Sequence, residues 1–308
     1  AFGKGDDAMF NFGDVFGDVR MGGGDDFFIN DTFQAGPLDL FGFVLGSVSM
    51  GSGDDVVLNG GSLGNVALGS GDDFYAAITP QSLLDNFDNP LVFASEIRAG
   101  SGSDTVYGGA NDDVIFGQSG SDVLNGHNGN DRISGGNGKD TIRGGNGDDT
   151  LNGGAGKDEL LGGNGDDTLL GGNGQDTLIG GRGDDEMSGG SGADTFILRS
   201  SISYGNIGND TITDLRDGDS IVLYPNFFTL GADGKVPTIS DELILSNITY
   251  GDGGTAVLDL HALFEVTGFA PLKNSSVTFE NVNEGDIDAD NFYTATDFLI
   301  DNPEVFIL

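Results

Sequence analysis

A repeat of nine residues runs without interruption from Ala99 to Ile197, and this period limits the chain to few folds. Each copy follows the frame Gly-Gly-x-Gly-x-Asp-x-apolar-x, whose positions are numbered here from the first glycine. Position six is aspartate in all eleven copies, and position eight is always apolar. A fixed period is the signature of repeat architectures, in which each unit buries its apolar face only against its neighbours. The sequence therefore predicts a coil of stacked units.

The residue types within one copy predict its local structure. Glycines at positions one, two and four favour a tight turn over the first six residues, with positive φ and exposed carbonyl oxygens. Positions seven to nine suit a short strand. We expect an all-β, right-handed parallel β-roll in which two copies, eighteen residues, make one lap. Laps about 4.8 Å apart place Asp149 over Asp131 and under Asp167.

The position-six aspartates point to a metal. Carboxylates stacked about 5 Å apart repel each other unless a cation lies between them. Oxygen donors on flexible turns favour Ca²⁺ over Mg²⁺ and over metals that bind Cys or His. The predicted carboxylate ligands in the regular repeat are Asp104, Asp113, Asp122, Asp131, Asp140, Asp149, Asp158, Asp167, Asp176, Asp185 and Asp194. The predicted glycine-turn donors are Gly136, Gly138, Gly145, Gly147, Gly154, Gly156, Gly163, Gly165, Gly172 and Gly174.

The frame resembles the RTX (repeats-in-toxin) nonapeptide of hemolysin-type calcium-binding proteins. This resemblance implies a β-roll in which each ion lies between a turn and the turn one lap later, held by position-six carboxylates and glycine-segment carbonyls. The copies nearest residues 99–130 depart from the frame, with Ala99 at position one, Asn111 at position four, and Gln118 and His127 at position two. We expect weaker sites there. Asn111 is the mildest change because Asn tolerates positive φ.

Residues 1–98 contain the same glycine and aspartate pattern, but its copies are fewer and farther apart. Positions two, four and six recur around Asp7, Asp26, Asp55 and Asp73, which are separated by 19, 29 and 18 residues. We predict a degenerate β-roll here, with calcium turns on one side only and variable loops on the other. Residues 99–197 form the regular β-roll of eleven nonapeptides.

Residues 198–308 lose the glycine frame and alternate apolar with polar residues. They predict a β-rich capping domain that covers the open edge of the roll, with a hairpin from Ile248 to Leu258. The ending 304–308, an acidic residue and an apolar tail, resembles the uncleaved secretion signal by which RTX proteins leave Gram-negative bacteria. The expected location is therefore extracellular, secreted or at the cell surface, after passage through a type I secretion channel.

Charge and composition exclude several classes. With 12 Lys+Arg against 50 Asp+Glu, the formal charge of −38 makes nucleic acid an unfavourable partner. About a dozen Ca²⁺ would cancel roughly two thirds of this charge, so we expect folding to depend on calcium. The absence of Cys excludes disulfides and thiolate zinc sites. No apolar run in the sequence is long enough for a transmembrane segment.

No catalytic pattern in the sequence withstands scrutiny. Gly60 to Gly64 matches a serine-hydrolase elbow, but only His127 and His261 offer an imidazole, and neither has a local signature. A His-Glu-x-x-His zinc motif is absent.

The first hypothesis for the function is a secreted, non-enzymatic calcium-binding component of the cell surface or matrix, with a self-assembling surface layer or filament as its specific version. Two alternatives are a C-terminal secretion module of a larger protease, lipase or epimerase, and an adhesin that binds glycans or surfaces. The expected partners are calcium, further copies of the chain, cell-surface components and the secretion channel.

Overall fold

The structure is a computed structural model in which the described residues form strands and turns. It describes residues 2–11, 14–15, 17–30, 43–44, 46–60, 62–77, 93–94, 96–199, 208–216, 218–224, 248–251, 254–259, 275–282, 287 and 292–294. No helix occurs in these ranges, and hence none that is long and apolar enough to cross a membrane. The chain divides into two compact units, Ala1–Glu159 and Leu160–Leu308, which are described separately.

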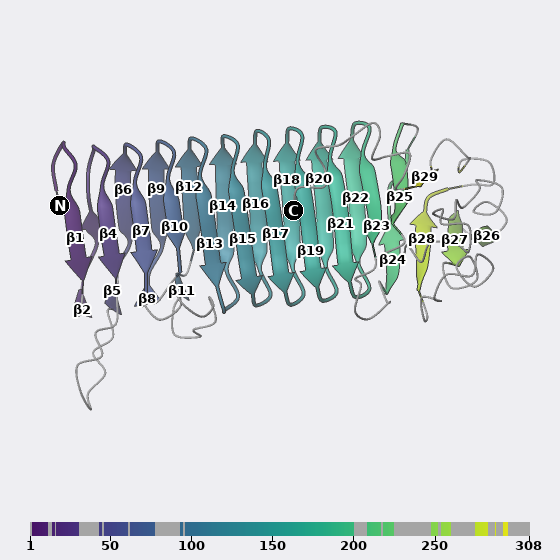
Figure 1. Cartoon of the computed structure of the whole chain (residues 1–308), viewed down its shortest axis with the longest axis horizontal. Coiled ribbons are helices and arrows are strands. Elements are labelled where there is room, and N and C mark those ends of the chain that lie inside the picture. Colours follow the sequence, from purple (N-terminus) through teal and green to yellow (C-terminus); the bar gives the residue numbers. More distant parts are fainter. Residues whose placement is uncertain are drawn as a thin grey trace, which may run out of the picture. The chain divides into compact units, whose positions relative to one another are not determined.

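The N-terminal unit is a parallel β-solenoid with two long sheets (Figure 1). The first sheet contains, in spatial order, β1 (Ala8–Asn11), β4 (Phe27–Asn30), β7 (Val56–Asn59), β10 (Phe74–Ala76), β13 (Thr105–Gly109), β15 (Val123–Asn128) and β17 (Thr141–Asn146). The second contains β3 (Val19–Arg20), β6 (Val48–Ser52), β9 (Val66–Ser70), β12 (Ile97–Ser101), β14 (Val114–Ser119), β16 (Arg132–Asn137) and β18 (Thr150–Ala155). The predicted parallel roll is confirmed.

The register between strands confirms the predicted length of a lap. Ile115 pairs with Ile133 and Ile133 with Leu151, so two nonapeptides separate equivalent residues. In the N-terminal laps, Phe27 pairs with Ala8 and with Val56, although these neighbours lie at unequal distances in the sequence. Extra residues are therefore accommodated outside the sheets, and the register of the strands is kept.

A third, short sheet closes the laps of the first hundred residues. It consists of β2 (Asp14–Val15), β5 (Phe43–Val44), β8 (Ser62–Leu63) and β11 (Phe93–Ala94), all parallel. After these strands, Gly46 and Gly64 stand where the regular repeat has its aspartate, and a Cβ on Gly64 would lie 2.1 Å from the Gly46 carbonyl oxygen. The two turns are packed too closely for a side chain, so this side of the N-terminal laps has no carboxylate row.

The C-terminal unit continues the same pattern and then changes it. One sheet contains β21 (Thr177–Arg182), β23 (Thr195–Arg199), β25 (Ser220–Tyr224) and β29 (Phe292–Thr294). The other contains β20 (Thr168–Asn173), β22 (Glu186–Ser191), β24 (Asn209–Ile212), β28 (Ser276–Glu280), β27 (Thr255–Asp259) and β26 (Ile248–Gly251). The strands β26 and β27 form the predicted hairpin, and β27 pairs antiparallel with β28. These antiparallel strands form the predicted β-rich cap. Strand β19 (Glu159–Asn164) lies at the boundary of the units.

The core is a row of position-eight side chains. Val106, Ile115, Leu124, Ile133 and Ile142 are fully or almost fully buried. The first laps add a polar element that the sequence did not predict. The Asn11 side chain donates to Asn30 Oδ1, Asn30 donates to Asn59 Oδ1, and Asn59 donates to the hydroxyl of buried Tyr75, at 2.7, 2.9 and 3.1 Å. This buried chain of hydrogen bonds links successive laps in one register.

The predicted division of a nonapeptide into turn and strand is wrong in its bounds. Strands such as β16 run from position seven to position three of the next copy, which leaves only positions four to six for the turn. The reason is strand pairing, because the glycine at position two pairs with the neighbouring lap; Gly136, for example, pairs with Gly154. Glycine is used here for close approach between strands as well as for turning.

Candidate metal centre

Each position-six aspartate ends a turn and points its side chain inward between two laps. Asp113, Asp131 and Asp149 are 1–2% exposed. The Asp113 N–H donates to Asp131 Oδ1 at 2.8 Å, and the Asp131 N–H donates to Asp149 Oδ1 at 2.8 Å. Every carboxylate of this ladder therefore uses one oxygen to bind the backbone of the previous lap. The predicted stacking of Asp149 over Asp131 is confirmed.

A separate ladder lies on the turns before the first-sheet strands, where the N–H groups of Asp104 and Asp122 donate to Asp122 and Asp140, and it includes the predicted N-terminal aspartates. The N–H groups of Asp7, Asp26, Asp55 and Asp73 donate in turn to Oδ1 of Asp26, Asp55, Asp73 and Asp104, at 2.7–2.8 Å. The irregular spacings read from the sequence thus correspond to consecutive laps, as predicted.

In the C-terminal unit, two further aspartates accept such bonds, one on the turns before each sheet, and both were missed from the sequence. Asp185 N–H donates to Asp210 Oδ1 at 3.3 Å, and Asp194 N–H donates to Asp219 Oδ1 at 2.9 Å. Both acceptors lie 25 residues after their donors, so the eighteen-residue period did not reveal them. Gly208-Asn209-Asp210-Thr211-Ile212 keeps positions four to eight of the frame, which was the available signal.

At ten of the ladder aspartates, the second carboxylate oxygen is buried and lacks a hydrogen-bond partner. Oδ2 has no hydrogen-bond partner at Asp26, Asp55, Asp73, Asp104, Asp113, Asp122, Asp131, Asp140, Asp185 and Asp194. A buried carboxylate oxygen without a partner is costly, and cations or donors normally satisfy such atoms. The structure therefore leaves a row of strong oxygen donors in need of a positive charge.

The space beside this oxygen exists because position one is glycine. A Cβ on Gly108 would lie 2.3 Å from Asp113 Oδ2 and 2.9 Å from the carbonyl oxygen of Gly126 in the next lap. Gly117 has the same relation to Asp122 Oδ2 and the Gly135 carbonyl, at 2.4 and 2.6 Å. A carboxylate and a carbonyl oxygen thus face one small space. The expectation that position one needs positive φ is wrong, because the described position-one glycines do not adopt it; room for the carboxylate is the reason for glycine.

Positions two and four do adopt positive φ, as predicted. Gly136 and Gly138 have φ values of 111° and 130°, and Gln118 and His127 keep φ values of 78° and 77° without being glycine. Asn111 at position four does not share this conformation, so the reason given for its mildness is wrong. The carbonyl oxygens of Gly136 and Gly138 point along the stack and would lie 2.2 and 1.5 Å from a Cβ on Gly154 and Gly156. The carbonyl oxygens of Gly163, Gly165, Gly172 and Gly174 are placed in the same way toward Gly181, Gly183, Gly190 and Gly192, and the role of the predicted glycines as calcium donors stays a prediction.

This donor set fits calcium. The oxygens are carboxylate and carbonyl, which Ca²⁺ accepts in large and variable numbers. Within the described residues, no three His, Cys, Asp or Glu side chains converge on one point, so main-chain oxygens must complete any site. A softer metal would lack nitrogen and sulfur ligands here.

Four N-terminal turns differ at position one. Met21, Met50, Leu68 and Ala99 occupy it and are fully buried. Their side chains fill a position that glycine leaves open in the regular copies. Asp26, Asp55 and Asp73 take part in the ladder hydrogen bonds, but an apolar side chain at position one occupies the space that glycine leaves open in the regular copies.

Burial raises the pKa of the ladder carboxyls. Desolvation is the largest cause at Asp113, whose pKa rises to about 8, with neighbouring Asp131 and Asp112 adding to it. The pKa of Asp131 and that of Asp122 rise to about 7, again chiefly through desolvation. Without a cation, these groups therefore hold protons at pH values where a free aspartate is ionised.

The metal-free roll is expected to lose stability as the pH rises. An unfolded aspartate titrates near 3.8, whereas Asp131 and Asp113 titrate near 7 and 8 in the fold. The folded state binds more protons between these values, so its stability is greatest below about pH 4 to 5 and falls through pH 8. Circular dichroism of the chelated protein at pH 5 and pH 8 checks this; more strand signal at pH 8 than at pH 5 would contradict it. With saturating calcium the dependence should reverse, because protons compete with the ion.

Replacing Gly126 by alanine is expected to destabilise the calcium form. The new Cβ would lie 1.9 Å from Asp131 Oδ2, so the carboxylate must move. Overpacking of this kind costs about 1–3 kcal/mol. Thermal unfolding in calcium measures the loss. The matched control is His127→Gly at the next residue, which relieves a positive φ and should be neutral or stabilising by about 1 kcal/mol. Equal effects of both changes would exclude this explanation.

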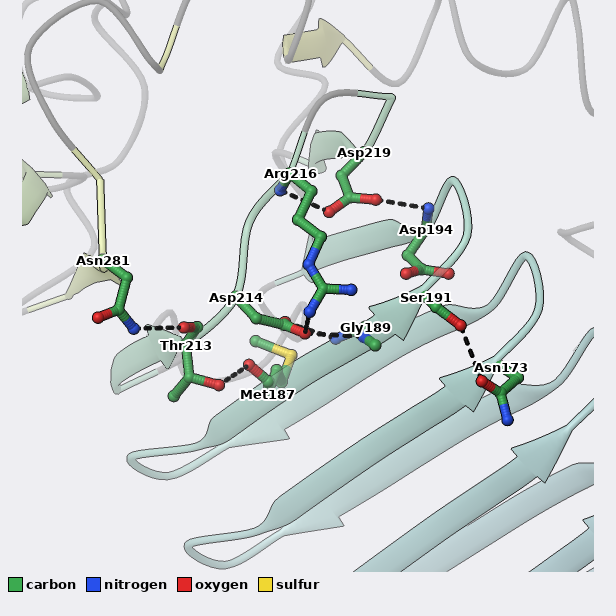
Figure 2. A network of polar contacts seen from close by, with 11 residues as sticks. Asn173, Met187, Gly189, Ser191, Asp194, Thr213, Asp214, Arg216, Asp219 and Asn281 are labelled. Atoms are coloured by element: carbon green, nitrogen blue, oxygen red, sulfur yellow. Dashed lines mark hydrogen bonds and ion pairs between the residues drawn. The ribbon is translucent and has the colours of Figure 1, made fainter.

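The ladder ends at a polar network in the C-terminal unit (Figure 2). Asp214 accepts the N–H groups of Gly189 and Gly190, both at 2.9 Å, one on each carboxylate oxygen. Asp219 accepts from Asp194 N–H on Oδ1 and from Arg216 N–H on Oδ2, at 2.9 and 2.8 Å. At this last turn a backbone N–H satisfies the second carboxylate oxygen, which is the atom left without a partner in the earlier laps.

Other sequence predictions have different outcomes. The His127 ring lies 5.8 Å from the Tyr107 ring of the preceding lap, centroid to centroid. His261 and the segment 304–308 lie outside the described residues. The expected domain boundaries at residues 98 and 197 stay predictions.

The middle of the chain matches a known family. Residues 96–124, 125–160 and 161–196 fit the model described as RTX calcium-binding nonapeptide repeat (4 copies). The predicted RTX resemblance is therefore confirmed. RTX nonapeptide repeats bind calcium and are typical of secreted proteins of Gram-negative bacteria. No curated protein matches the sequence.

Three solved structures show similarity. The AlgE6R3 subunit of the Azotobacter vinelandii mannuronan C5-epimerase is 29% identical, with a TM-score of 0.34, and the match covers 49% of this chain and 80% of that one. A hyperactive, Ca²⁺-dependent, β-helical antifreeze protein from an Antarctic bacterium is 20% identical, with a TM-score of 0.47 and coverages of 74% and 82%. The extracellular lipase LipA from Serratia marcescens is 17% identical, with a TM-score of 0.31 and coverages of 73% and 45%.

Proposed function

We propose that this chain of RTX calcium-binding repeats is a secreted, non-enzymatic structural component of the cell surface or extracellular matrix, which folds when it meets calcium. The row of buried Oδ2 atoms without partners carries the proposal. A fold that buries so many carboxylates is stable only if a cation compensates them. Calcium is abundant outside cells, so export precedes folding.

The ions are held by the position-six aspartates together with main-chain carbonyls of the glycine turns. Asp113 Oδ2 and the Gly126 carbonyl, which face one space, are a representative pair. About a dozen ions would suit the number of turns and offset a large part of the negative charge. Residues 1–98, 99–197 and 198–308 serve as the degenerate roll, the regular roll and the cap, and the ending 304–308 directs export through a type I channel.

Self-assembly is the specific form of this function. Within the described residues, β1 pairs on one edge only, with β4, whereas the outer edge of β3 is contacted by the Phe2 N–H, which donates to the Arg20 carbonyl. An open edge of parallel strands offers unpaired backbone groups to a further chain. Further copies of this protein could therefore add at this edge once calcium has ordered the laps.

Electron microscopy and sedimentation with and without calcium test the assembly. We expect polymers in calcium and monomers in chelator. Monodisperse particles at high concentration in calcium would contradict assembly. The mass of the native protein from cells separates this proposal from the enzyme-module alternative, since a parent much larger than 31.7 kDa would favour the latter.

A second candidate, an adhesin, is favoured by an apolar strip on the outer face of the first sheet. The strip comprises Phe10, Phe27, Ile29, Val56, Leu58, Phe74, Tyr107 and Val123. Phe10 is 56% exposed, and the ring pairs Phe10–Phe27 and Phe74–Tyr107 have centroids 6.0 and 5.9 Å apart. Apolar surface arranged in rows commonly marks a contact site.

Binding to glycan arrays and to apolar surfaces tests the adhesin. Phe10→Ser with Phe74→Ser should abolish binding that depends on the strip. Phe116→Ser on the second sheet, where Arg98 lies 5.0 Å from the ring, is the matched control. Binding that survives the paired change excludes the strip as the contact.

A further inference from the structure

The turns of the nonapeptide array differ at position five, directly before the buried aspartate. Turns that precede strands of the second sheet carry Asp112, Asn130 and Asp148. Turns that precede strands of the first sheet carry Ser103, Ser121, Lys139 and Lys157. All seven residues are exposed, so burial in the core does not dictate their identity. The two sets are called the second-sheet turns and the first-sheet turns.

Aspartate or asparagine at position five forms a second link between laps, here called the position-five clamp. Asp112 Oδ1 accepts the N–H of Asn130 at 2.8 Å, and Asn130 Oδ1 accepts the N–H of Asp148 at 3.0 Å. These bonds run toward the next lap, whereas the buried aspartates accept from the previous lap. A turn with both links is therefore held to its neighbours in both directions.

The clamp recurs at other turns that have aspartate at position five. In the C-terminal unit, Asp166 accepts from the Asp184 N–H and Asp184 from the Asn209 N–H, both at 2.8 Å. In the first laps, Asp6 accepts from Asp25 and Asp25 from Asp54, both at 3.0 Å. The geometry thus belongs to the residue type and not to one place in the chain.

The first-sheet turns of the array do not offer this acceptor to the next lap, although the Ser103 N–H itself donates to Asp72 Oδ1 of the preceding lap at 2.7 Å. Lysine has no acceptor, so Lys139 and Lys157 cannot form it. Neither Ser103 nor Ser121, which lie in the described part of the chain, accepts such a bond from the next lap. The lysines also place a positive charge one residue before Asp140 and Asp158.

We propose that the position-five residue sets calcium affinity, so that the second-sheet turns bind first and the first-sheet turns fill only at higher calcium. This inference rests on the proposed calcium-binding function. Because binding of the ion is coupled to folding, a clamp that forms in the folded turn adds its free energy to binding and raises the affinity of that turn. An ammonium beside the site repels the ion, and the effect is moderated by solvent because the side chain is exposed. The two effects act in the same direction.

Isothermal titration of the full chain with calcium tests the proposal. The wild type should show a tight and a weak phase. Ser121→Asn with Lys139→Asn supplies acceptors for the N–H groups of Lys139 and Lys157. This variant should move the weak phase to lower calcium by roughly fivefold per clamp, the factor that one hydrogen bond contributes.

The control, Ser121→Ala with Lys139→Ala, removes the same charge without adding an acceptor and should shift the weak phase less. In the reverse direction, Asn130→Lys should enlarge the weak phase.

The outcomes separate the two ideas. Calcium binding in one phase, or equal isotherms for the asparagine and alanine variants, overturns the position-five proposal and leaves calcium binding intact. A wild type that binds no calcium overturns the proposed function as well. The changes are at exposed positions, and the wild-type isotherm decides the number of phases even if a variant does not fold.

Discussion

Removal of calcium by a chelator is expected to convert the protein from a β-roll into a largely unfolded chain. The fold buries the ladder carboxylates and leaves Oδ2 of residues such as Asp113 and Asp131 without a hydrogen-bond partner. The formal charge of −38 adds repulsion throughout the chain. Binding free energy of the ions is therefore folding free energy, as in other domains that fold on their metal.

Far-ultraviolet circular dichroism and small-angle scattering measure this transition. Addition of calcium after chelation should restore strand signal and reduce the radius of gyration, and an equal concentration of magnesium should restore much less, because Mg²⁺ demands strict octahedral geometry. Sodium chloride at matched ionic strength controls for screening of the surface charge. Strand content that stays unchanged in chelator would refute the calcium-dependent fold.

Replacement of Asp131 by asparagine is expected to have opposite effects on the two states of the protein. An amide oxygen can still accept the Asp113 N–H, which lies 2.8 Å from Oδ1, so the backbone link is kept. The charge at Oδ2 is lost. In calcium, affinity at the adjoining turns should fall at least about tenfold, a loss comparable to that seen when second-shell partners of a metal are removed. In chelator, the variant should be more resistant to unfolding than the wild type, because a buried charge has been removed.

Calcium titration and the strand signal that remains in chelator measure the two effects on the same pair of proteins. Asp131→Ala is the informative comparison, since it removes the charge and the backbone link together and should destabilise both states. Asp112→Asn, at the exposed neighbouring position, controls for the change of net charge. If Asp131→Asn lowered stability equally with and without calcium, the carboxylate would have a purely structural role.

The sequence predicted the coil, its eighteen-residue lap and the identity of the buried row, because a nine-residue period admits only one way of stacking alternate copies. The unequal spacings of Asp7, Asp26, Asp55 and Asp73 were also interpretable, since only whole laps bring such turns together. Asp210 and Asp219 escaped prediction because their laps contain extra residues and only fragments of the frame. The predicted strand bounds were wrong because glycine in a sequence indicates a turn, whereas Gly136 and its equivalents pair within strands.

The sequence by itself determined the periodic placement of carboxylates and apolar residues, and with it the requirement for a cation, because charge and period are local properties. Only the tertiary structure decided how the two oxygens of each carboxylate are divided between a backbone hydrogen bond and an open space. One oxygen binds the backbone of the previous lap, and the other faces the room left by a position-one glycine. That division depends on contacts between residues eighteen positions apart, and the opposite direction of the position-five hydrogen bonds depends on the same contacts. Such relations arise only when laps stack at strand spacing.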